Sequence, residues 1–379
     1  MSTTTSQALV SINKLRNHLN QMFPERQSQV EGILMALLAS EHAVFLGPPG
    51  GAKSAMVRHA ARAFGYKVFE TLLARFTKPP EVFGLISLKG IENDEVIYKT
   101  KGMLPDADVA ILDEIFKAGT ALLNSLLAAI NERTFFNGTL GPQKIPLRSV
   151  FGASNEMPQG EGLDALWDRF LFRYDTKYLV AKDNFVNMAS APDAEPVQMF
   201  DGAVLTQAGE EAMATVVGKR FYEAMFDLRG ALLQENVILS DRRWKKVVKA
   251  AKAAAYLAGE SEADPADFLQ LEACLWNEAK QRPIVSKVLY ATLDTTLSAM
   301  NELLQSSKEE VNRFNASAKG IKESTAYGKT LRAIKDKAHK GLSNAGPRNK
   351  PRLEGMYREI ENNWKIVIKQ AADAVGASV

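Results

Sequence analysis

Between residue 24 and about residue 180, short apolar runs alternate with stretches whose apolar positions follow helical periodicity. A short apolar run that ends in turn residues is typical of a strand buried in a parallel sheet. Strands of this kind that alternate with helices predict a three-layer α/β domain built on a parallel sheet. The predicted strands are 43–46, 67–73, 109–112, 149–153 and 170–175, and the predicted helices are 24–40, 53–64, 118–130 and 163–169.

The strand pattern stops near residue 180, and the rest of the chain divides by composition. Residues 183–206 contain Pro192 and Pro196 and predict a connector, whereas residues 207–304 are rich in Ala, Leu and Lys with helical periodicity. A Gly- and Pro-containing stretch at 341–351 predicts a loop before a last helix at 353–375. We therefore expect an N-terminal tail and lead-in at 1–24, an α/β core at 25–182, a connector at 183–206, an all-helical domain at 207–304 and a basic helical segment at 305–379.

The composition is that of a globular protein, with 46% apolar and 24% charged residues among 379. The single cysteine, Cys274, rules out an internal disulfide and a cysteine-based zinc site. The four histidines show no ligand spacing, and no apolar run approaches the roughly 18 residues that a membrane helix needs. The first residues also lack the pattern of a signal peptide. We expect a cytoplasmic protein without membrane insertion.

The formal net charge of +3 does not by itself demand a nucleic-acid or membrane partner. Residues 301–379, however, hold 15 Lys and Arg against 9 Asp and Glu, a net charge of +6, whereas the first 300 residues carry −3. A solvated helical face is the favoured interpretation of this basic segment, and a docking surface for an acidic partner or nucleic acid is the alternative. Tyr327 is the only Tyr or Trp in residues 305–352, which is poor aromatic interleaving for base stacking.

A glycine-rich loop lies between the first predicted strand and the helix that follows it, the context of a phosphate-binding loop. Glycines let backbone N–H groups turn toward phosphates, and the helix N-terminus adds partial positive charge. Lys53 is expected to pair with the β- and γ-phosphates and the Ser54 hydroxyl to hold Mg²⁺. Ala52 stands where the general pattern has a second glycine, and because alanine tolerates a helical conformation there, we expect the loop to form. The loop consists of Gly47, Pro48, Pro49, Gly50, Gly51, Ala52, Lys53 and Ser54.

Two carboxylates end the apolar strand predicted at 109–112, 60 positions after Lys53. Parallel α/β sheets bind ligands at the carboxyl ends of their strands. Asp113 is expected to hold Mg²⁺, and Glu114 to activate the attacking water as a general base. The alternative is that both only cap the next helix, where carboxylates are favoured.

Three further residues complete the candidate chemistry. Asn155 follows another predicted strand and is expected to hold the lytic water or a γ-phosphate oxygen, although Ser-Asn after a strand commonly forms a turn. Arg169 precedes the fifth strand, and Arg242 follows a predicted helix N-cap at Ser240 or Asp241. Arginines commonly stabilise the charge that develops in phosphoryl transfer, and surface salt bridges are the alternative role for both.

Five motifs, at 47–54, 109–114, 150–156, 164–170 and 239–244, occur in the order found in AAA+ ATPases, and the chain resembles the MoxR family and its RavA-like group most closely. Supporting phrases lie at 73–84, 112–119, 129–135, 153–158 and 240–246. Ala52 is usual in MoxR phosphate loops. The resemblance covers about residues 20–300 and implies a P-loop core followed by a helical lid domain.

The resemblance also implies roles for the matched residues. Lys53 and Ser54 correspond to Walker A, Asp113 and Glu114 to Walker B, and Asn155 to sensor 1. Arg169 resembles the arginine finger that acts on a neighbouring subunit's ATP, and Arg242 the sensor 2 arginine, with the adjacent Arg243 as the alternative. Two β-hairpins are expected, at 85–99 with a turn at Asn93-Asp94 and at 134–139. In the second hairpin, packing is the favoured role of Phe135 and Phe136 over gripping substrate.

Relatives form rings, commonly hexamers, and often act with a partner that carries a von Willebrand factor A domain. The resemblance therefore implies a Mg²⁺-dependent, homo-oligomeric ATPase that remodels or matures a partner protein. One alternative is an ATP-gated switch or scaffold that does no mechanical work. A weaker alternative, motivated by the basic segment, is an AAA+ ATPase directed at nucleic acid.

Overall fold

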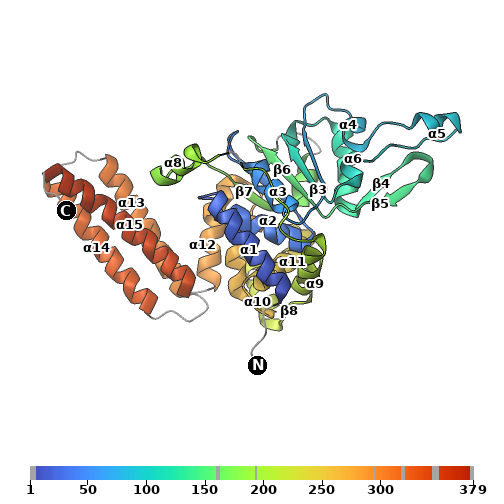
Figure 1. Cartoon of the computed structure of the whole chain (residues 1–379). Helices are drawn as coiled ribbons and strands as arrows, with labels where there is room; N and C mark the ends of the chain where they lie inside the picture. The colour runs from blue at the N-terminus through green and yellow to red at the C-terminus, as the bar shows by residue number, and fades with distance from the viewer. Residues whose placement is uncertain are drawn as a thin grey trace. The chain divides into compact units, whose positions relative to one another are not determined.

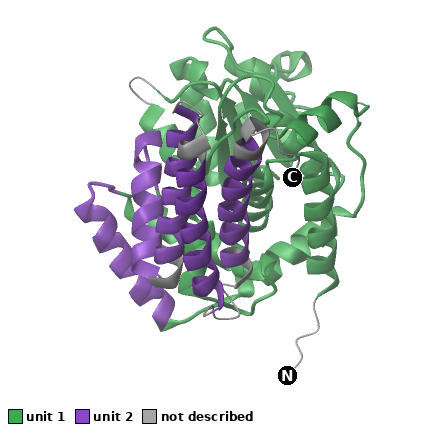
Figure 2. Cartoon of the chain, turned by 90° about the vertical axis from the view of Figure 1, so that its left-hand side faces the viewer, with its two compact units in different colours: residues 1–219, 239–275 green, residues 220–238, 276–379 purple. Residues whose placement is uncertain are grey.

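The computed structural model of the protein describes residues 6–158, 163–192, 194–293, 295–316, 321–343 and 350–375, and its elements are labelled in Figure 1. The chain divides into two units, which Figure 2 distinguishes by colour. The first unit contains residues 1–219 and 239–275, and the second contains 220–238 and 276–379. The chain therefore leaves the first unit at residue 220, returns to it at 239 and ends in the second unit. The domains predicted from the sequence are consecutive and do not contain this alternation.

A five-stranded parallel sheet forms the centre of the first unit, in the order β2-β3-β6-β1-β7. All five predicted strands are confirmed to within two residues at either end. β1 and β6 are buried throughout, as expected for central strands covered on both faces. The strands are β1 (His42–Leu46), β2 (Val68–Leu72), β3 (Val109–Asp113), β6 (Ser149–Ser154) and β7 (Phe170–Asp175).

Helices flank this sheet on both sides (Figure 1). The four helices predicted for the core are present as α2 (Gln27–Ala39), α3 (Lys53–Arg62), α6 (Thr120–Glu132) and α7 (Leu163–Arg169). α2 and α3 pack against strands of the sheet, and α6 packs against α7. α7 passes into β7 without an intervening loop, because Arg169 ends the helix and Phe170 begins the strand.

The lead-in region contains a helix that the sequence analysis did not predict, α1 (Gln7–Met22). Ser6 caps it by accepting a hydrogen bond from the Leu9 N–H at 3.1 Å. The buried positions Leu9, Ile12, Leu15 and Leu19 form one apolar face, and the helix packs against α2 and α9. The longest continuous apolar run of the segment is the three residues 8–10, so the signal lies in the helical spacing of its apolar positions.

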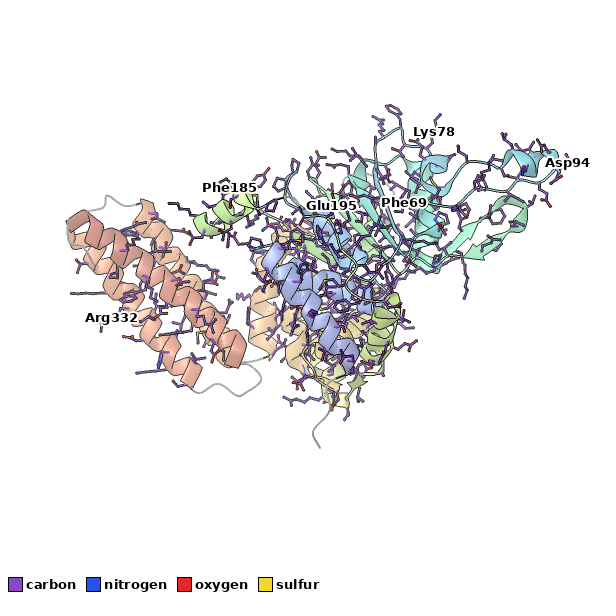
Figure 3. All side chains as sticks on the ribbon, viewed as in Figure 1. Phe69, Lys78, Asp94, Phe185, Glu195 and Arg332 are labelled. Atoms are coloured by element: carbon purple, nitrogen blue, oxygen red, sulfur yellow. The ribbon has the colours of Figure 1, made fainter. Side chains whose placement is uncertain are left out.

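Two excursions project from the core at residues 84–100 and 134–144 (Figure 1), and Asp94 marks the end of the first (Figure 3). The prediction of two paired strands at 85–99 is wrong. The chain reverses at Asp94, but a single antiparallel bridge joins Ile86 to Tyr98 and a short helix, α5 (Leu88–Glu92), lies between them. Ser87 caps this helix by accepting from the Gly90 N–H, and the Leu-Lys-Gly-Ile-Glu sequence lacks β-branched alternation.

The second hairpin is confirmed, because β4 (Thr134–Phe136) pairs antiparallel with β5 (Pro142–Lys144). Its connection is longer than a two-residue Asn-Gly turn and contains a short 3-10 helix, Gly138–Leu140. Gly138 has a φ of +55°, and a Cβ there would lie 1.9 Å from the Val96 carbonyl oxygen, so this glycine lets the two excursions approach each other. The short α4 (Pro79–Phe83) precedes the first excursion.

Residues 182–275 complete the first unit except for residues 220–238. The predicted connector contains α8 (Lys182–Ser190) and the start of α9 (Gly202–Ala214). Most described residues of 207–304 lie in helices, but residues 258–281 contain turns and short 3-10 helices, and a two-residue parallel pair joins β8 (Val216–Val217) to β9 (Glu262–Ala263). α11 (Asp241–Leu257) packs against α2 and α9. Short 3-10 helices occur in the first unit at Leu104–Asp106, Ile115–Lys117, Pro265–Gln270 and Glu272–Cys274.

The second unit consists mainly of helices, and its described residues outside helices include 235–238 and 276–278. Its last three helices pack on one another around buried Phe314, Leu331 and Val367. The last predicted helix is confirmed and begins three residues early, whereas residues 344–349 of the predicted 341–351 loop lie outside the described part. None of the helices described in either unit is long and apolar enough to cross a membrane. The helices are α10 (Lys219–Gln234), α12 (Arg282–Leu293), α13 (Thr295–Ala316), α14 (Ile321–Ser343) and α15 (Lys350–Val375), with a 3-10 turn at Ala279–Gln281.

Candidate nucleotide-binding site

A cavity of about 300 Å³ lies where the carboxyl ends of the central strands meet the N-terminus of α3. Parallel strands bring their carboxyl ends to one edge, so the residues that follow β1 and β3 meet there despite their separation in sequence. The structure thus brings together the predicted phosphate loop and the predicted carboxylate pair. The cavity is lined by Pro49, Gly50, Gly51, Ala52, Lys53, Ser54, Ala55, Leu72, Asp113, Glu114, Ala153 and Ser154.

The backbone of the glycine-rich loop depends on two positions with positive φ. Gly47 has a φ of +138°, and a Cβ there would lie 2.0 Å from the carbonyl oxygen of Thr176, so only glycine fits. Ala52 has a φ of 61° and a ψ of 20°, which is the left-handed region. The loop is present as expected, but the helical conformation that the sequence analysis gave as the reason is wrong for Ala52. The loop must reverse direction just before α3, and an L-residue in this region costs about 1 to 2 kcal/mol.

Replacing Ala52 by glycine is expected to raise the free energy of unfolding by about 0.5 kcal/mol, because glycine removes the left-handed penalty but gains freedom in the unfolded chain. Gly47→Ala is the matched reverse substitution and is expected to cost about 1 to 3 kcal/mol through strain. Urea unfolding monitored by circular dichroism measures both. A lower stability for Ala52→Gly would contradict the left-handed conformation of Ala52.

Lys53 is held over the loop by two backbone carbonyls. Its Nζ donates to the carbonyl oxygens of Gly47 at 2.6 Å and Pro48 at 2.8 Å. Partial burial lowers the pKa of Lys53, and the negative charges of Asp113 and Glu114 oppose that shift. The side chain therefore places a cation beside the free N–H groups of the first turn of α3, which together suit a phosphate group.

Ser54 and Asp113 form a direct contact across the cavity. The Ser54 hydroxyl donates to Asp113 Oδ1 at 2.6 Å, which joins the first turn of α3 to the end of β3. Hydroxyl and carboxylate oxygens are the donors that Mg²⁺ prefers, so this pair fits the ion, with phosphate oxygens and water to complete its shell. The described residues contain no group of three or more His, Cys, Asp and Glu that could hold a metal ion on its own.

Glu114 follows Asp113 in a left-handed conformation, with a φ of 52°. Its Oε2 lies 3.2 Å from Lys117 Nζ, yet this buried oxygen makes no hydrogen bond within the described structure. The two consecutive carboxylates thus have different partners, because Asp113 contacts the loop and Glu114 contacts Lys117. Lys117 was not among the sequence candidates, although its position three residues after Glu114 on a helical turn is a signal for such a pair.

Asn155 lies at the same edge of the sheet but outside the residues that line the cavity. The preceding Ser154 lines it and ends β6, and its hydroxyl both donates to the Glu156 carbonyl at 2.9 Å and accepts from the Glu156 N–H at 3.1 Å. This is the turn that the sequence permits at Ser-Asn. The Asn155 side chain is exposed beside that turn.

Arg169 and Arg242 lie at adjoining ends of α7 and α11. The Ser240 hydroxyl caps α11 by accepting from the Arg243 N–H at 3.2 Å, and it lies 3.3 Å from Asp168 Oδ1 as a donor. Asp168 Oδ2 is also 3.5 Å from Arg169 Nη1. Burial lowers the pKa of Arg169, and the charge of Arg242 lowers it further. Neither arginine lines the cavity of its own chain.

The structure distinguishes the two neighbouring arginines of α11. Arg242 is exposed, whereas Arg243 is only 1% exposed and donates to the carbonyl oxygens of Phe170, Leu171 and Cys274. Arg243 is therefore occupied within the protein, and Arg242 is the one of the two whose side chain is exposed. The sequence could have distinguished the two arginines by helical spacing, because Arg243 lies on the same helix face as Val247 and Ala250, which are buried.

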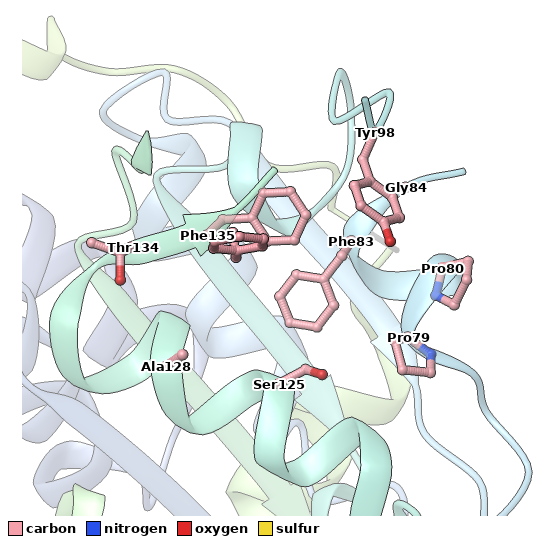
Figure 4. A pocket seen from close by; sticks show the side chains of 10 residues that line it. Pro79, Pro80, Phe83, Gly84, Tyr98, Ser125, Ala128, Thr134 and Phe135 are labelled. Carbon is pink, nitrogen blue, oxygen red and sulfur yellow. The ribbon is translucent and has the colours of Figure 1, made fainter. Parts of the chain in front are cut away.

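A second cavity, of about 240 Å³, lies between α4, α6 and the β4–β5 hairpin (Figure 4). Phe135 stacks on Phe83 with ring centroids 5.4 Å apart and contacts the edge of Tyr98 at 5.8 Å. Phe135 is thus a packing residue, as favoured from the sequence. Phe136, by contrast, is 67% exposed, so the same expectation does not hold for it.

Comparisons with known proteins agree with this architecture. A family model described as the MoxR domain in the MoxR-vWA-beta-propeller ternary systems matches residues 10–195, and a model of an AAA lid domain matches residues 220–289. A solved structure of a candidate ATPase from Cytophaga hutchinsonii aligns with a TM-score of 0.62 at 15% identity, over 74% of this chain and 94% of that one. The fold and these matches define the class: an AAA+ ATPase with a helical lid.

Two uncharacterized proteins of Methanocaldococcus jannaschii are similar to the chain in sequence. One is 34% identical over 375 residues, which cover 94% of this chain and 98% of that protein. The other is 39% identical over 287 residues, which cover 75% of each. The chain belongs to the MoxR family of AAA+ ATPases.

Proposed function

We propose that this ATPase works as a Mg²⁺-dependent, ring-forming assembly that remodels or helps to mature a partner protein. The observation that carries the catalytic part is the arrangement at the strand ends. Lys53 lies over the loop, Ser54 contacts Asp113 at 2.6 Å, and Glu114 stands beside this pair with a different partner. A helix cap alone does not account for the contact between Ser54 and Asp113, which lie 59 positions apart in the sequence.

Each group has a role that follows from its position. Lys53 and the N–H groups at the start of α3 bind the β- and γ-phosphates of ATP. Ser54 and Asp113 hold Mg²⁺, which when bound neutralises charge on the phosphates. Glu114 accepts the proton of the attacking water, and Asn155 orients that water from the same edge. The loop residues Gly47, Pro48, Pro49, Gly50, Gly51 and Ala52 shape the phosphate cradle.

Arg169 and Arg242 act on the nucleotide of a neighbouring subunit. Both lie at the junction of α7 and α11, where Asp168 pairs with Arg169 and contacts Ser240, and neither lines the cavity of its own chain. Arginine stabilises the charge that develops on the transferred phosphoryl group. A complete catalytic site therefore needs two chains, and a ring supplies one such site at every interface.

Specific ATPase activity is expected to rise with protein concentration, because dilute monomers lack the arginines that act in trans. A dilution series of steady-state ATPase assays, paired with sedimentation velocity on the same samples, measures activity against assembly. The midpoints of the two curves should coincide. Full specific activity in samples that sediment as monomers would contradict the shared site.

The remodelling part is supported by the matched family model, whose description pairs the MoxR domain with vWA and beta-propeller components. A protein with a von Willebrand factor A domain is thus the proposed partner class. The competing function is a nucleotide-gated switch. Capture of the partner in ATP but not in ADP, without increased protease sensitivity of that partner, would favour the switch over remodelling.

The proposal that the ATPase is directed at nucleic acid has little support in the basic segment at 305–379, where none of the Phe, Tyr and Trp side chains that the structure describes is exposed. Phe314 is 1% exposed and contacts the half-buried Tyr327 edge-on at 5.6 Å, so both rings pack in the interior of the helical bundle. Several charges of α13 and α15 are also paired, as in Lys308–Glu359 and Lys365–Glu361. Single-strand binding requires exposed rings beside basic side chains.

A further inference from the structure

Two buried arginines, Arg173 and Arg243, lie where α7, β7 and α11 meet, and the roles proposed above use neither of them. Each is 1% exposed. Burying a guanidinium is costly unless its donors are satisfied, so the acceptors that surround it indicate what it holds together.

Arg243 joins three backbone segments. Its Nε donates to the Cys274 carbonyl at 2.7 Å, its Nη1 to the Phe170 carbonyl at 3.1 Å, and its Nη2 to the Leu171 carbonyl at 2.6 Å. Burial lowers the pKa of Arg243 to about 10, so the side chain stays charged at neutral pH. The first turn of α11 is thereby fixed to the start of β7.

An irregularity in β7 creates this acceptor pair. β7 is an edge strand that pairs only with β1, in a register that aligns His42 with Phe170 and Ala43 with Phe172. Leu171 is thus an extra residue without a partner in β1, which is a β-bulge. Two consecutive carbonyls of the bulged strand accept from one planar guanidinium, a geometry that the fork of arginine fits and a lysine ammonium does not.

Arg173 fixes the other side of the same junction. Its Nη2 donates to the Trp167 carbonyl in the last turn of α7 at 2.9 Å, and its Nε donates to the Phe170 carbonyl at 3.1 Å. Its guanidinium also lies 4.3 Å from the centroid of the Trp167 ring. The Phe170 carbonyl is therefore a shared acceptor that joins the end of α7 to the start of α11.

We infer that Arg243 is a positioning residue for Arg169 and Arg242, an inference that rests on the function proposed above. Arg169 directly precedes Phe170, and Arg242 directly precedes Arg243. By holding the shared Phe170 carbonyl and the bulged Leu171, Arg243 fixes the spacing between the two functional guanidinium groups. The exposed contact between Ser240 and Asp168 at 3.3 Å supports the same spacing from the solvent side.

The test compares Arg243→Lys with Lys246→Ala. Lys246 lies on the same helix, and its partly buried side chain pairs with the buried Glu41 at 2.7 Å, but it takes no part in the β7 junction, so it controls for general destabilisation. For Arg243→Lys we expect kcat to fall at least about 10-fold while the dissociation constant of a fluorescent ATP analogue stays within about twofold. Lys246→Ala should lower the thermal midpoint and leave kcat within about twofold.

Mixing Arg243→Lys chains with Lys53→Ala chains supplies a second measurement, the recovery of ATPase activity. A general loss of stability in Arg243→Lys would not be reversed by such mixing. The Lys53→Ala chain keeps intact arginines, and the Arg243→Lys chain keeps an intact phosphate loop. An equal mixture should therefore recover activity up to about a quarter of wild type, because about a quarter of the interfaces in a random ring join an intact phosphate loop to intact arginines. If Arg243→Lys does not fold, Ser240→Ala takes its place, with a smaller loss of kcat and the same recovery.

Two results would overturn the inference. One is unchanged kcat in Arg243→Lys. The other is a loss of kcat in Arg243→Lys that persists after mixing with Lys53→Ala, although mixing with Lys53→Ala restores activity to Arg169→Ala. Failure of the Arg169→Ala mixture itself would instead overturn the shared site of the proposed function, so the two failures are distinguishable.

Discussion

Glu114→Gln is expected to bind ATP with unchanged affinity and to lower kcat by about 10³-fold, within the range that general-base groups contribute. Glutamine keeps the size and shape of the side chain but cannot accept the proton of water. Asp113, Ser54 and Lys53 are left intact, and they hold the phosphates and Mg²⁺ in the proposed site. The variant should therefore accumulate in the ATP-bound state.

The measurement is a steady-state ATPase assay beside equilibrium binding of a fluorescent ATP analogue. Glu132→Gln makes the same chemical change at an exposed position at the end of α6, and it should leave both quantities unchanged. Lost ATP binding in Glu114→Gln would place Glu114 among the binding groups. Wild-type turnover would remove it from catalysis altogether.

Arg169→Ala is expected to lower kcat by about 10³-fold, the lower end of what a trans-acting arginine contributes. Its partial burial, its buried Nε without a hydrogen-bond partner among the described residues and its absence from the cavity lining all suit a group that meets a nucleotide only in an assembly. Lys53→Ala is expected to be inactive for the different reason that it cannot hold the phosphates.

An equal mixture of the two inactive chains should regain up to about a quarter of wild-type activity, because a quarter of the interfaces in a random ring pair an intact site with an intact arginine. Arg242→Ala mixed with Lys53→Ala should behave in the same way, since Arg242 lies beside Arg169. Recovery with Arg169→Ala but not with Arg242→Ala would mean that Arg242 acts on the nucleotide of its own chain.

The strands and the convergence at their ends could be predicted from the sequence for a physical reason. Each strand is a short apolar run between turn residues, and parallel pairing forces their carboxyl ends to one edge. Asp113 and Ser54 therefore meet although 59 residues separate them. The residue types of the loop and the strand ends, together with the parallel pairing of the strands, were sufficient to predict this part of the site.

Other features depend on contacts that no local pattern contains. The left-handed Ala52 follows from the direction in which the loop enters α3, and alanine gives no local signal for it. The burial of Arg243 depends on carbonyls of β7 more than 70 residues away, although helical spacing already separates its face from that of Arg242. The short helix at Leu88–Glu92 formed where a hairpin was expected, because capping by Ser87 favours a turn of helix there.

The environment of Cys274 has a practical consequence for measurements on this protein. It is the one cysteine in the chain, its side chain is fully buried, and burial raises its pKa to about 12. Only a thiolate reacts readily with maleimides, so the native chain should remain unlabelled at neutral pH. A cysteine introduced at Asp94, at the end of the projecting excursion (Figure 3), would then be the sole reactive thiol, and a dye placed there would report on that excursion without any prior removal of native cysteines.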